Sequence, residues 1–322
     1  GYIGSHTCHQ LVEAGEKVIV IDNFYSGHRW AVPEGATLVE GDAGDTDLTT
    51  RLMQQHAVDT VIHFAGHIVV PESVVDPLKY YRNNTQNSRN LLEACMQSGV
   101  NQFVFSSTAA VYGIPDEQPA SETTPTAPIN AYGRSKLMTE WMMNDLSQRP
   151  DVADPFRFIA LRYFNVAGAR PDLKVGQATP EATHLIKVAC QAALGQREAI
   201  EIFGTDYPTR DGTGVRDYIH VEDLAAAHLA ALSHLRAGGD SQVLNCGYGQ
   251  GYSVREVIQM VKKVSGVDFN VIESPRRAGD SPELIAANQR IRSTLDWQTR
   301  YQDLEVICRT AYEWEALWAT MQ

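Results

Sequence analysis

The sequence has no long uninterrupted apolar run and no excess of positive charge. Hydrophobic residues make up 43% of the 322 positions, an ordinary share for a globular protein. No apolar stretch approaches the ~18 residues that a membrane-spanning helix needs. Asp and Glu number 39 against 27 Lys and Arg, which gives a formal net charge of −12. These absences argue against a membrane or a nucleic acid as partner, although locally gathered arginines can still bind an anionic ligand.

Cysteine is scarce as well. The five cysteines are scattered, odd in number and without C-x-x-C spacing. This pattern argues against a zinc site, and we expect no bound metal. It is typical of reduced cysteines that pack in the interior of a cytoplasmic protein. The residues are Cys8, Cys95, Cys190, Cys246 and Cys308.

A strand is missing ahead of the first glycines. Gly1 and Gly4, in the opening "GYIGSH", have the spacing of the second half of a glycine-rich dinucleotide fingerprint. A complete fingerprint follows a β-strand and at least one earlier glycine. In a doubly wound sheet that first strand is central, and its loss would expose two unpaired strand edges. We therefore expect the natural protein to carry a strand and at least one glycine ahead of Gly1.

The segment after these glycines is consistent with a nucleotide site. A helical pattern ends at Gly15, and the β-branched run "KVIVID" then ends in Asp22. An acidic residue about 20 positions beyond the glycines accepts hydrogen bonds from the adenosine ribose hydroxyls. Its charge repels a 2′-phosphate, which favours NAD over NADP. The alternative is an acidic residue that only caps a loop.

Strand-like and helix-like segments alternate over the first half of the chain, the βαβ rhythm of an open parallel sheet. We predict an α/β fold with a doubly wound parallel (Rossmann) sheet and a second, smaller substrate-binding domain. The nucleotide-binding domain is predicted at 1–165 plus about 217–245, and the smaller domain at 166–216 and 246–322. The expected strands are "KVIVID", "TLVEGD", "VDTVIHFAG", "QFVFSS" and "FRFIALRYFN", and the expected helices lie near 5–15, 45–56, 72–98, 130–148, 183–195, 221–236, 253–265 and 303–320.

Tyr132 and Lys136 are the strongest local signal for chemistry. They stand four positions apart in "NAYGRSKLMTEWMM", so on a helix they share one face with Cβ atoms about 5–6 Å apart. A tyrosine hydroxyl is a poor base at neutral pH, but a neighbouring ammonium stabilises the phenolate and lowers its pKa. The pair therefore predicts a general base beside a hydride acceptor.

Several motifs stand in order over nearly the whole chain: "GYIGSH", "HFAG", "FSSTAAVYG", Tyr132-x-x-x-Lys136, "LRYFNVAGA" and "GTGVRDYIHVEDLA". Together they resemble the extended short-chain dehydrogenase/reductase superfamily and, within it, the UDP-glucose (UDP-galactose) 4-epimerase family. The resemblance implies a homodimeric isomerase with bound NAD. Hydride would pass from sugar carbon 4 to NAD, the 4-keto sugar would rotate, and hydride would return to its other face.

The resemblance also implies roles for individual residues on the cofactor side. Tyr132 would be the base, Lys136 its electrostatic partner on the nicotinamide ribose, and Thr108 a donor to the sugar 4-oxygen. Many family members have Lys where this chain has His67 and Ile68, which leaves a cofactor contact at Ile68 open. The cofactor residues would be Gly1, Tyr2, Ile3, Gly4, Asp22, Asn23, Phe24, Tyr25, Ser26, Gly27, Asp42, Ala43, Phe64, Ala65, Gly66, Asn84, Tyr132, Lys136 and Phe164.

On the substrate side, the resemblance places Arg216 and Arg277 on the UDP diphosphate, which suits the bidentate fork of arginine. The family often has Asn at the position of His184, and both side chains can donate to a phosphate. Leu284 would wall the pocket beside the sugar 2-substituent, or only pack under the C-terminal domain. The remaining UDP-sugar contacts would be Thr108, Tyr132, Asn165, Leu185, Glu201, Ile202, Phe203 and Asp280.

Three alternatives bear on the activity. A nucleotide-sugar 4,6-dehydratase needs an acid and a base after the Thr, but Ala109 and Ala110 stand there and cannot transfer a proton. A 4-epimerase of another nucleotide sugar, such as UDP-N-acetylglucosamine, UDP-glucuronate or a UDP-pentose, stays open. A non-catalytic NAD- or UDP-sugar-binding protein should have lost the Tyr or the Lys, and this chain keeps both. The physiological pathway, galactose catabolism or polysaccharide precursor supply, also stays open.

The predicted helices over 79–98 and 131–147 carry more apolar surface than one sheet-facing stripe requires. The resemblance implies that two such helices per subunit form a four-helix bundle in a homodimer. The alternative is that both helices only lie on the sheet. The apolar residues are Tyr81, Leu91, Leu92, Cys95, Leu137, Met138, Trp141 and Met142.

Overall fold

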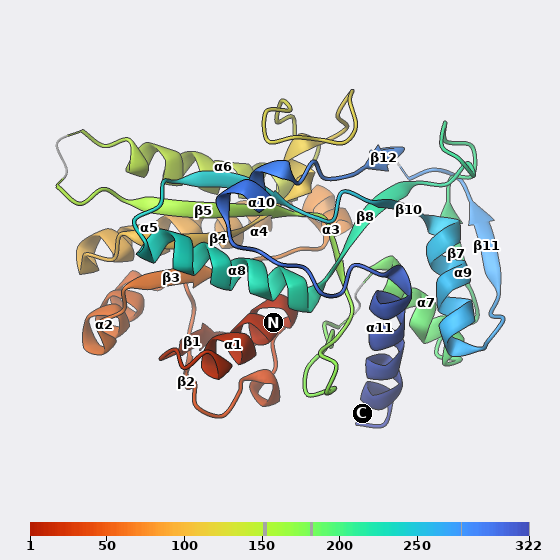
Figure 1. Ribbon diagram of the computed structural model, residues 1–322, viewed down its shortest axis with the longest axis horizontal. Coiled ribbons are helices and arrows are strands. Elements are labelled where there is room, and N and C mark those ends of the chain that lie inside the picture. The colour runs from red at the N-terminus through yellow and green to blue at the C-terminus, as the bar shows by residue number, and fades with distance from the viewer. Residues whose placement is uncertain (151–152, 181–182, 278, 322) are drawn as a thin grey trace.

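Four strands pair in parallel to form the central sheet of the protein (Figure 1). In this computed structural model, which describes residues 1–322 except 151–152, 181–182, 278 and 322, their order is β3-β4-β5-β9. The strands are β3 (Thr60–His63), β4 (Gln102–Thr108), β5 (Arg157–Tyr163) and β9 (Gln242–Cys246). Every neighbouring pair is parallel, which confirms the predicted doubly wound α/β fold.

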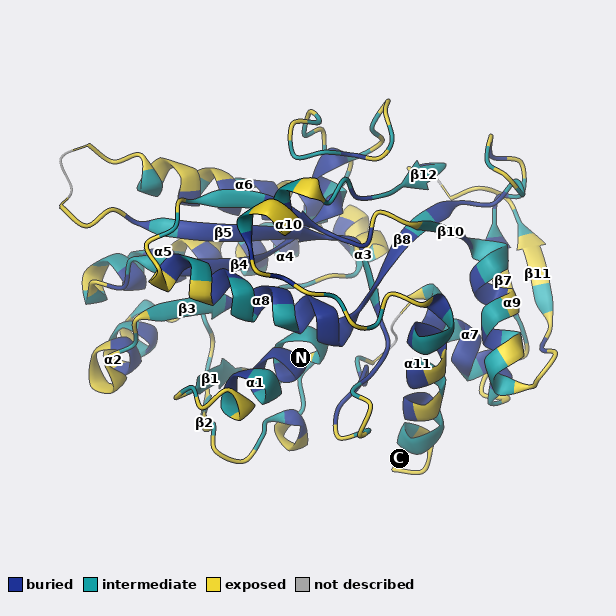
Figure 2. Cartoon of the chain, viewed as in Figure 1, coloured by how far each residue is buried: buried dark blue, intermediate teal, exposed yellow. Residues whose placement is uncertain are grey.

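Both faces of this sheet are covered by helices. Side chains alternate along the strands, so each face carries apolar side chains that a helix layer buries. On β4, Phe103 and Phe105 belong to a buried cluster with residues of α5 and α6. Val104, on the other face, is buried with Leu224 and Ala227 of α8. Figure 2 shows β5 buried along its length between these layers. The covering helices are α5 (Asn87–Ser98), α6 (Ala131–Ser147) and α8 (Val221–Arg236).

Two further strands form a separate parallel sheet, β1 paired with β2. Helix α1 begins directly after Gly1 and packs against α8. Gly15 follows the helix with a φ of +84°, a backbone conformation that suits glycine at a helix end. The expected strand ahead of Gly1 stays a prediction. The elements are α1 (Tyr2–Glu13), β1 (Ile19–Asp22), β2 (Thr37–Glu40) and α2 (Thr46–His56), which packs on α5.

The predicted helix over 72–98 is divided into shorter pieces. Pro77 lacks a backbone N–H, and Asp76 ahead of it leaves the helical conformation, so two short helices are separated there. A π-helical turn over Tyr81–Gln86 then leads into α5, and the residues at the junction keep helical backbone angles. The short helices are α3 (Val70–Val75) and α4 (Pro77–Tyr80).

Most of the remaining elements lie beyond one end of the central sheet, while α10 lies beside β9 of that sheet (Figure 1). Strand β8 pairs with β6, β10 and β12, and β7 pairs with β11, while α7, α9 and α11 pack together beside them. Strand β8 continues directly into α8, so the chain passes from this part back to the central sheet. The elements are β6 (Asn165–Ala167), α7 (Leu185–Ala193), β7 (Ile200–Phe203), β8 (Val215–His220), β10 (Gly251–Ser253), α9 (Val254–Ser265), β11 (Val271–Ser274), β12 (Glu283–Leu284), α10 (Gln289–Thr294) and α11 (Leu304–Ala319).

All five cysteines are buried with free thiols. Among the described residues, no helix combines the length and apolarity of a membrane span. In the same part of the chain, no group of three or more His, Cys, Asp and Glu side chains is arranged to hold a metal ion.

Candidate active site

A cleft of about 1050 Å³ lies along the carboxyl ends of the parallel strands and extends between β1 and β3. Ligand sites of doubly wound sheets lie at this edge, because the loops that follow the strands converge there. Ile68, whose cofactor contact the sequence left open, also lines the cleft. The predicted site residues that line it are Gly1, Tyr2, Ile3, Gly4, Asp22, Asn23, Tyr25, Ser26, Asp42, Ala43, Phe64, Ala65, Gly66, Thr108, Tyr132, Lys136, Phe164, Asn165, His184, Arg216, Asp280 and Leu284.

Eight predicted site residues lie outside this lining. Asn84 is buried behind the cleft, where its amide group accepts from the His67 N–H (2.8 Å) and donates to the His67 carbonyl (3.0 Å). It therefore shapes the turn that follows β3. Leu185 begins α7, Gly27 lies against the Asp22 carboxylate, and the others lie on or near β1, β7 and the loop after β11. The eight are Phe24, Gly27, Asn84, Leu185, Glu201, Ile202, Phe203 and Arg277.

Helix α6 carries both members of the predicted catalytic pair. Its N-terminus is capped by the Asn130 side chain, which accepts from the Gly133 N–H at 2.9 Å. Lys136 is buried one turn further on, and its Nζ donates to the Ser106 carbonyl at 2.9 Å. Burial lowers the pKa of the Lys136 ammonium to about 8. The ammonium is thus held at one position in the cleft lining and has N–H groups left for a ligand.

Burial raises the pKa of Tyr132, and a hydrogen bond with Thr108 only partly opposes this effect. The direction is opposite to the lowered pKa that the sequence predicted. The reason is that desolvation disfavours the phenolate and that the Lys136 ammonium points to Ser106. The Thr108 hydroxyl accepts from the Ala110 N–H at 3.1 Å, which leaves its own proton for the hydrogen bond with Tyr132.

A buried ion pair that sequence reasoning missed lies directly behind these groups. Glu140, one helical turn beyond Lys136, binds Arg162 of β5 through two contacts, Nη2–Oε2 at 2.5 Å and Nε–Oε1 at 3.0 Å. Ser107 of β4 donates to the same carboxylate at 2.5 Å. Burial opposes the charge on Arg162, but its hydrogen bonds to Glu140 more than offset this and raise its pKa. The Glu140 side chain thus joins α6 to the strand end that carries Thr108, and its i+4 spacing from Lys136 was the available signal.

The cofactor side of the cleft has the shape that a dinucleotide needs. A Cβ at Gly66 would stand 3.2 Å from Lys136 Nζ, and one at Gly4 would stand 3.4 Å from the Phe64 ring, so glycine keeps both approaches open. Asp22 Oδ2 lies 3.2 Å from the Gly1 backbone nitrogen, which places the predicted ribose-binding carboxylate beside the glycine turn. Among the described residues, no side chain caps the N-terminus of α1, and its first N–H groups are available to a phosphate.

The substrate side brings positive charge to the other end of the cleft. Arg216 lies 3.9 Å from the Asp280 carboxylate and donates to the Val215 carbonyl at 2.9 Å. The Arg277 guanidinium stacks on the Phe203 ring at 3.5 Å from its centroid. Leu284 packs against a buried cluster that includes Phe164. The cleft thus offers Arg216 and an apolar wall to an anionic ligand, while Arg277 lies outside the lining against Phe203.

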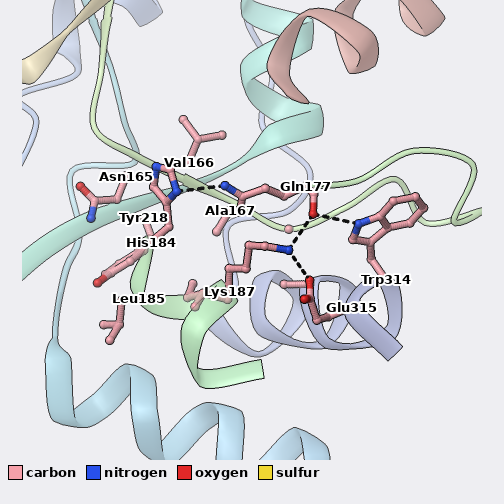
Figure 3. Close-up of a pocket in the computed structure, with 13 residues that line it drawn as sticks. Asn165, Val166, Ala167, Gln177, His184, Leu185, Lys187, Tyr218, Trp314 and Glu315 are labelled. Atoms are coloured by element: carbon pink, nitrogen blue, oxygen red, sulfur yellow. Dashed lines mark hydrogen bonds and ion pairs between the residues drawn. The ribbon is translucent and has the colours of Figure 1, made fainter. Parts of the chain in front are cut away.

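His184 stands at the start of α7, where it is held from behind (Figure 3). Its Nδ1 is 2.9 Å from the Gln177 side-chain nitrogen. The Gln177 backbone carbonyl accepts from Lys187 Nζ (3.0 Å) and from the Trp314 indole N–H (3.2 Å). Lys187 also forms a buried ion pair with Glu315 at 2.6 Å. These contacts join α7, α11 and Gln177 beside the cleft.

Comparison with known proteins agrees with this geometry. The model of the NAD dependent epimerase/dehydratase family matches residues 1–247, and the chain belongs to that family.

Within the family the similarity is narrower. The chain is 56% identical over 315 residues to a UDP-glucose 4-epimerase of Azospirillum brasilense, which covers 98% of this chain and 89% of that protein. The crystal structure of the UDP-glucose 4-epimerase from Brucella ovis in complex with NAD has a TM-score of 0.93 at 43% identity, covering 97% and 95% of the two chains. The UDP-Glc/GlcNAc 4-epimerase from Campylobacter jejuni has a TM-score of 0.86 at 49% identity, covering 98% and 97%.

Proposed function

We propose that this protein is an NAD-dependent UDP-glucose 4-epimerase, an isomerase that interconverts UDP-galactose and UDP-glucose. One observation carries the proposal: Thr108, Tyr132 and Lys136 meet in a single cleft between a glycine-lined cofactor side and an arginine-bearing substrate side. The close relatives named above carry the same activity in their names.

In this proposal Tyr132 moves the proton. As phenolate it takes the proton of the sugar 4-hydroxyl, and it returns that proton to the 4-oxygen once the sugar has turned over. The Thr108 hydroxyl, which accepts from the Ala110 N–H, donates its own proton to the same oxygen and holds it beside Tyr132. Bound NAD supplies the hydride acceptor and a positive charge, which counteracts the desolvation that raises the pKa of Tyr132.

Lys136 and the arginines position the ligands. Lys136 donates one N–H to Ser106 and keeps the others for the hydroxyls of the nicotinamide ribose. Arg216 and Arg277, with His184, bind the diphosphate, so the 4-keto sugar stays tethered while it rotates. The rotating sugar meets the apolar surface of Leu284 and Phe164, which offers no polar group to hold one orientation. The other predicted contacts that line the cleft are proposed in the roles given above.

The activity is tested by incubating the purified protein with UDP-galactose and separating the products chromatographically. Accumulation of UDP-glucose without added NAD supports the proposal. Conversion of only another nucleotide sugar would favour the alternative 4-epimerase. A protein that binds NAD and UDP but converts neither substrate would be the non-catalytic alternative.

The assembly and location are proposed with the function. We infer a homodimer, because large apolar side chains are exposed on neighbouring helices. Trp141 of α6 is 56% exposed, Val75 of α3 is 86% exposed and Leu78 of α4 is 76% exposed. Light scattering that gives a monomer mass at micromolar concentration contradicts this inference. The five buried thiols support a cytoplasmic location.

The domain division is also proposed. The NAD-binding domain covers 1–165 and about 217–245, and the UDP-sugar-binding domain covers 166–216 and 246–322. The continuity of β8 with α8 supports the return of the chain to the first domain near residue 217.

A further inference from the structure

The segment that follows β1 crosses the cofactor side of the cleft, and we call residues 23–32 the strap. Six of its residues line the cleft. Trp30 does not line it, yet it makes more aromatic contacts than any other strap residue among those described. The lining residues are Asn23, Tyr25, Ser26, His28, Ala31 and Val32.

One end of the strap is held by Tyr25. Its ring meets the His67 ring edge-on, with centroids 4.6 Å apart, and its hydroxyl accepts from Lys79 Nζ at 3.0 Å. Lys79 is itself paired with Glu72 at 2.5 Å, and hydrogen bonds to Glu72 and Tyr25 raise the pKa of Lys79 to about 12. This end is therefore attached to α3 and α4, beside the loop that follows β3.

The other end is held by Trp30. Its ring stacks on Trp314 of α11 with centroids 5.7 Å apart at 29°, and lies 5.4 Å from Trp318 one turn further along the helix. His28, two residues earlier, stacks on the Trp30 ring with centroids 5.3 Å apart. Its Nε2 is 3.0 Å from the Ala178 carbonyl oxygen. Trp30 is nevertheless 45% exposed, so it is not a core residue. We infer that its contacts attach the strap to α11.

The surface that receives Trp30 is rigid. The Trp314 indole donates to the Gln177 carbonyl at 3.2 Å (Figure 3). A Cβ at Gly176 would stand 2.3 Å from the Trp314 ring, so the backbone of that loop lies flat against it. Lys187 and Glu315 fasten α11 to α7 immediately beside it.

The strap is also braced against β1 and β2. Phe24, just ahead of Tyr25, has a φ of +58°, an unfavourable conformation for a bulky residue, and its N–H donates to Asp22 Oδ1 at 2.7 Å. The Arg29 guanidinium stacks on the Phe24 ring at 4.5 Å and pairs with Glu40 of β2. A segment braced in this way opens by releasing an end, and the Trp30 end has no ion pair to α11 among the described contacts.

We propose that Trp30 is a positioning residue that latches the strap onto α11 and thereby retains the dinucleotide through the catalytic cycle. The inference rests on the proposed function, in which hydride returns to the sugar from which it came and the cofactor must not leave between the two transfers. The strap spans from α3 and α4 to α11 across the cofactor side, so the cofactor leaves only after one end releases. Trp30 acts through the strap and touches no reacting atom.

The test measures cofactor retention. Protein loaded with NAD is diluted into NAD-free buffer, and the NAD that stays bound is released with acid at intervals and quantified. Trp30→Ala should release NAD about tenfold faster or more than the wild type, since both aromatic contacts to α11 are lost. Trp318→Ala should also accelerate release, and the double variant should add little to Trp30→Ala, since both residues form one latch.

Two controls separate a latch from general destabilisation. Ile272→Ala removes a similarly exposed apolar side chain on β11, away from the cleft, and should leave the release rate unchanged. Trp30→Phe keeps a ring at the same place and should restore most of the retention. With saturating NAD, Trp30→Ala should keep a kcat close to that of the wild type, since only retention is altered.

The outcomes are distinguishable from failure of the proposed function. Equal release rates for wild type and Trp30→Ala, or no rescue by Trp30→Phe, overturn the latch even if the protein epimerises UDP-galactose. Faster release from Trp30→Ala supports the latch whichever nucleotide sugar is the substrate. If Trp30→Ala does not fold, the NAD release rates of Trp30→Leu and Trp318→Ala are compared with that of the wild type instead. A wild type that retains no NAD at all overturns the latch, whereas the proposed function fails only if UDP-galactose is not converted with NAD added.

Discussion

Glu140 and Arg162 form a two-point ion pair in the interior, with Nη2–Oε2 at 2.5 Å and Nε–Oε1 at 3.0 Å, one helical turn from Lys136. Both side chains are almost fully buried. Arg162 Nη1 also donates to the Tyr112 hydroxyl at 3.0 Å. The pair therefore connects the catalytic helix to β5 at a place where water cannot replace a lost partner.

Glu140→Gln should consequently destabilise the protein strongly. It leaves the Arg162 charge without its carboxylate, and breaking a buried pair on one side costs about 3–5 kcal/mol of unfolding free energy. Urea unfolding measures this change. The matched control is Glu93→Gln, which breaks the exposed i,i+4 pair with Arg89 and should cost less than about 1 kcal/mol. Equal effects of the two substitutions would show that the buried pair has no special weight.

Tyr132→Phe should retain the ligands and lose turnover. The change removes the proton-transferring hydroxyl and little packing, so we expect a loss of about 10²–10⁴ in kcat with near-normal binding of NAD and UDP. Steady-state kinetics and ligand titration check the two halves of this expectation. Near-normal turnover in the variant would show that another group moves the proton.

Lys136 should make the stability of the cofactor-free protein depend on alkaline pH. Its folded-state pKa of about 8 lies below the ordinary value of 10.5, so between these values the unfolded state binds more protons. The Lys136 contribution to the unfolding free energy therefore rises with pH across this window, by up to about 1.4 kcal/mol per pH unit. The difference in stability between wild type and Lys136→Met, followed from pH 8 to 10, isolates it. A difference that stays constant would mean that the Lys136 pKa is not lowered.

Leu284 should set the breadth of sugars accepted. We expect preference for UDP-glucose and UDP-galactose, with poorer but measurable turnover of UDP-N-acetylglucosamine. A pocket change of a few methylene-sized groups alters kcat/KM by about 10–200-fold. Leu284→Ser should narrow the gap between the substrate classes, and Leu284→Tyr should widen it. If both variants keep the wild-type ratio, Leu284 only packs against the cluster around Phe164.

The central sheet and the catalytic helix were predictable because their signals are local. The run "FRFIALRYFN" is mostly apolar and aromatic, as is typical of a strand buried on both faces, and β5 occupies most of it, with Arg162 as a buried exception. Helix α6 was expected over 130–148, and it spans Ala131–Ser147. Gly15 and Gly99 end helices where glycine permits a positive φ.

What could not be predicted depends on residues that are distant in the sequence. Trp30 and Trp314 meet across 284 positions, and no local pattern marks either as the other's partner. Arg162 lies 22 positions from Glu140 on a different element, so no local pattern pairs them. Only the i+4 spacing of Glu140 from Lys136 is visible in the sequence. The pKa of Tyr132 was predicted in the wrong direction, because desolvation and the direction of the Lys136 ammonium follow from tertiary packing.

The central claim, that hydride leaves sugar carbon 4 and returns to it while Tyr132 handles only the proton, is tested most directly with deuterium. UDP-galactose carrying deuterium at carbon 4 is converted in ordinary water, unlabelled UDP-galactose is converted in D₂O, and the UDP-glucose from each is analysed by mass spectrometry and NMR. The account predicts that the first product keeps its deuterium at carbon 4 and that the second gains none there. Loss of the label to water, or uptake of solvent deuterium at carbon 4, would contradict the account, because carbon 4 would then exchange a proton with solvent.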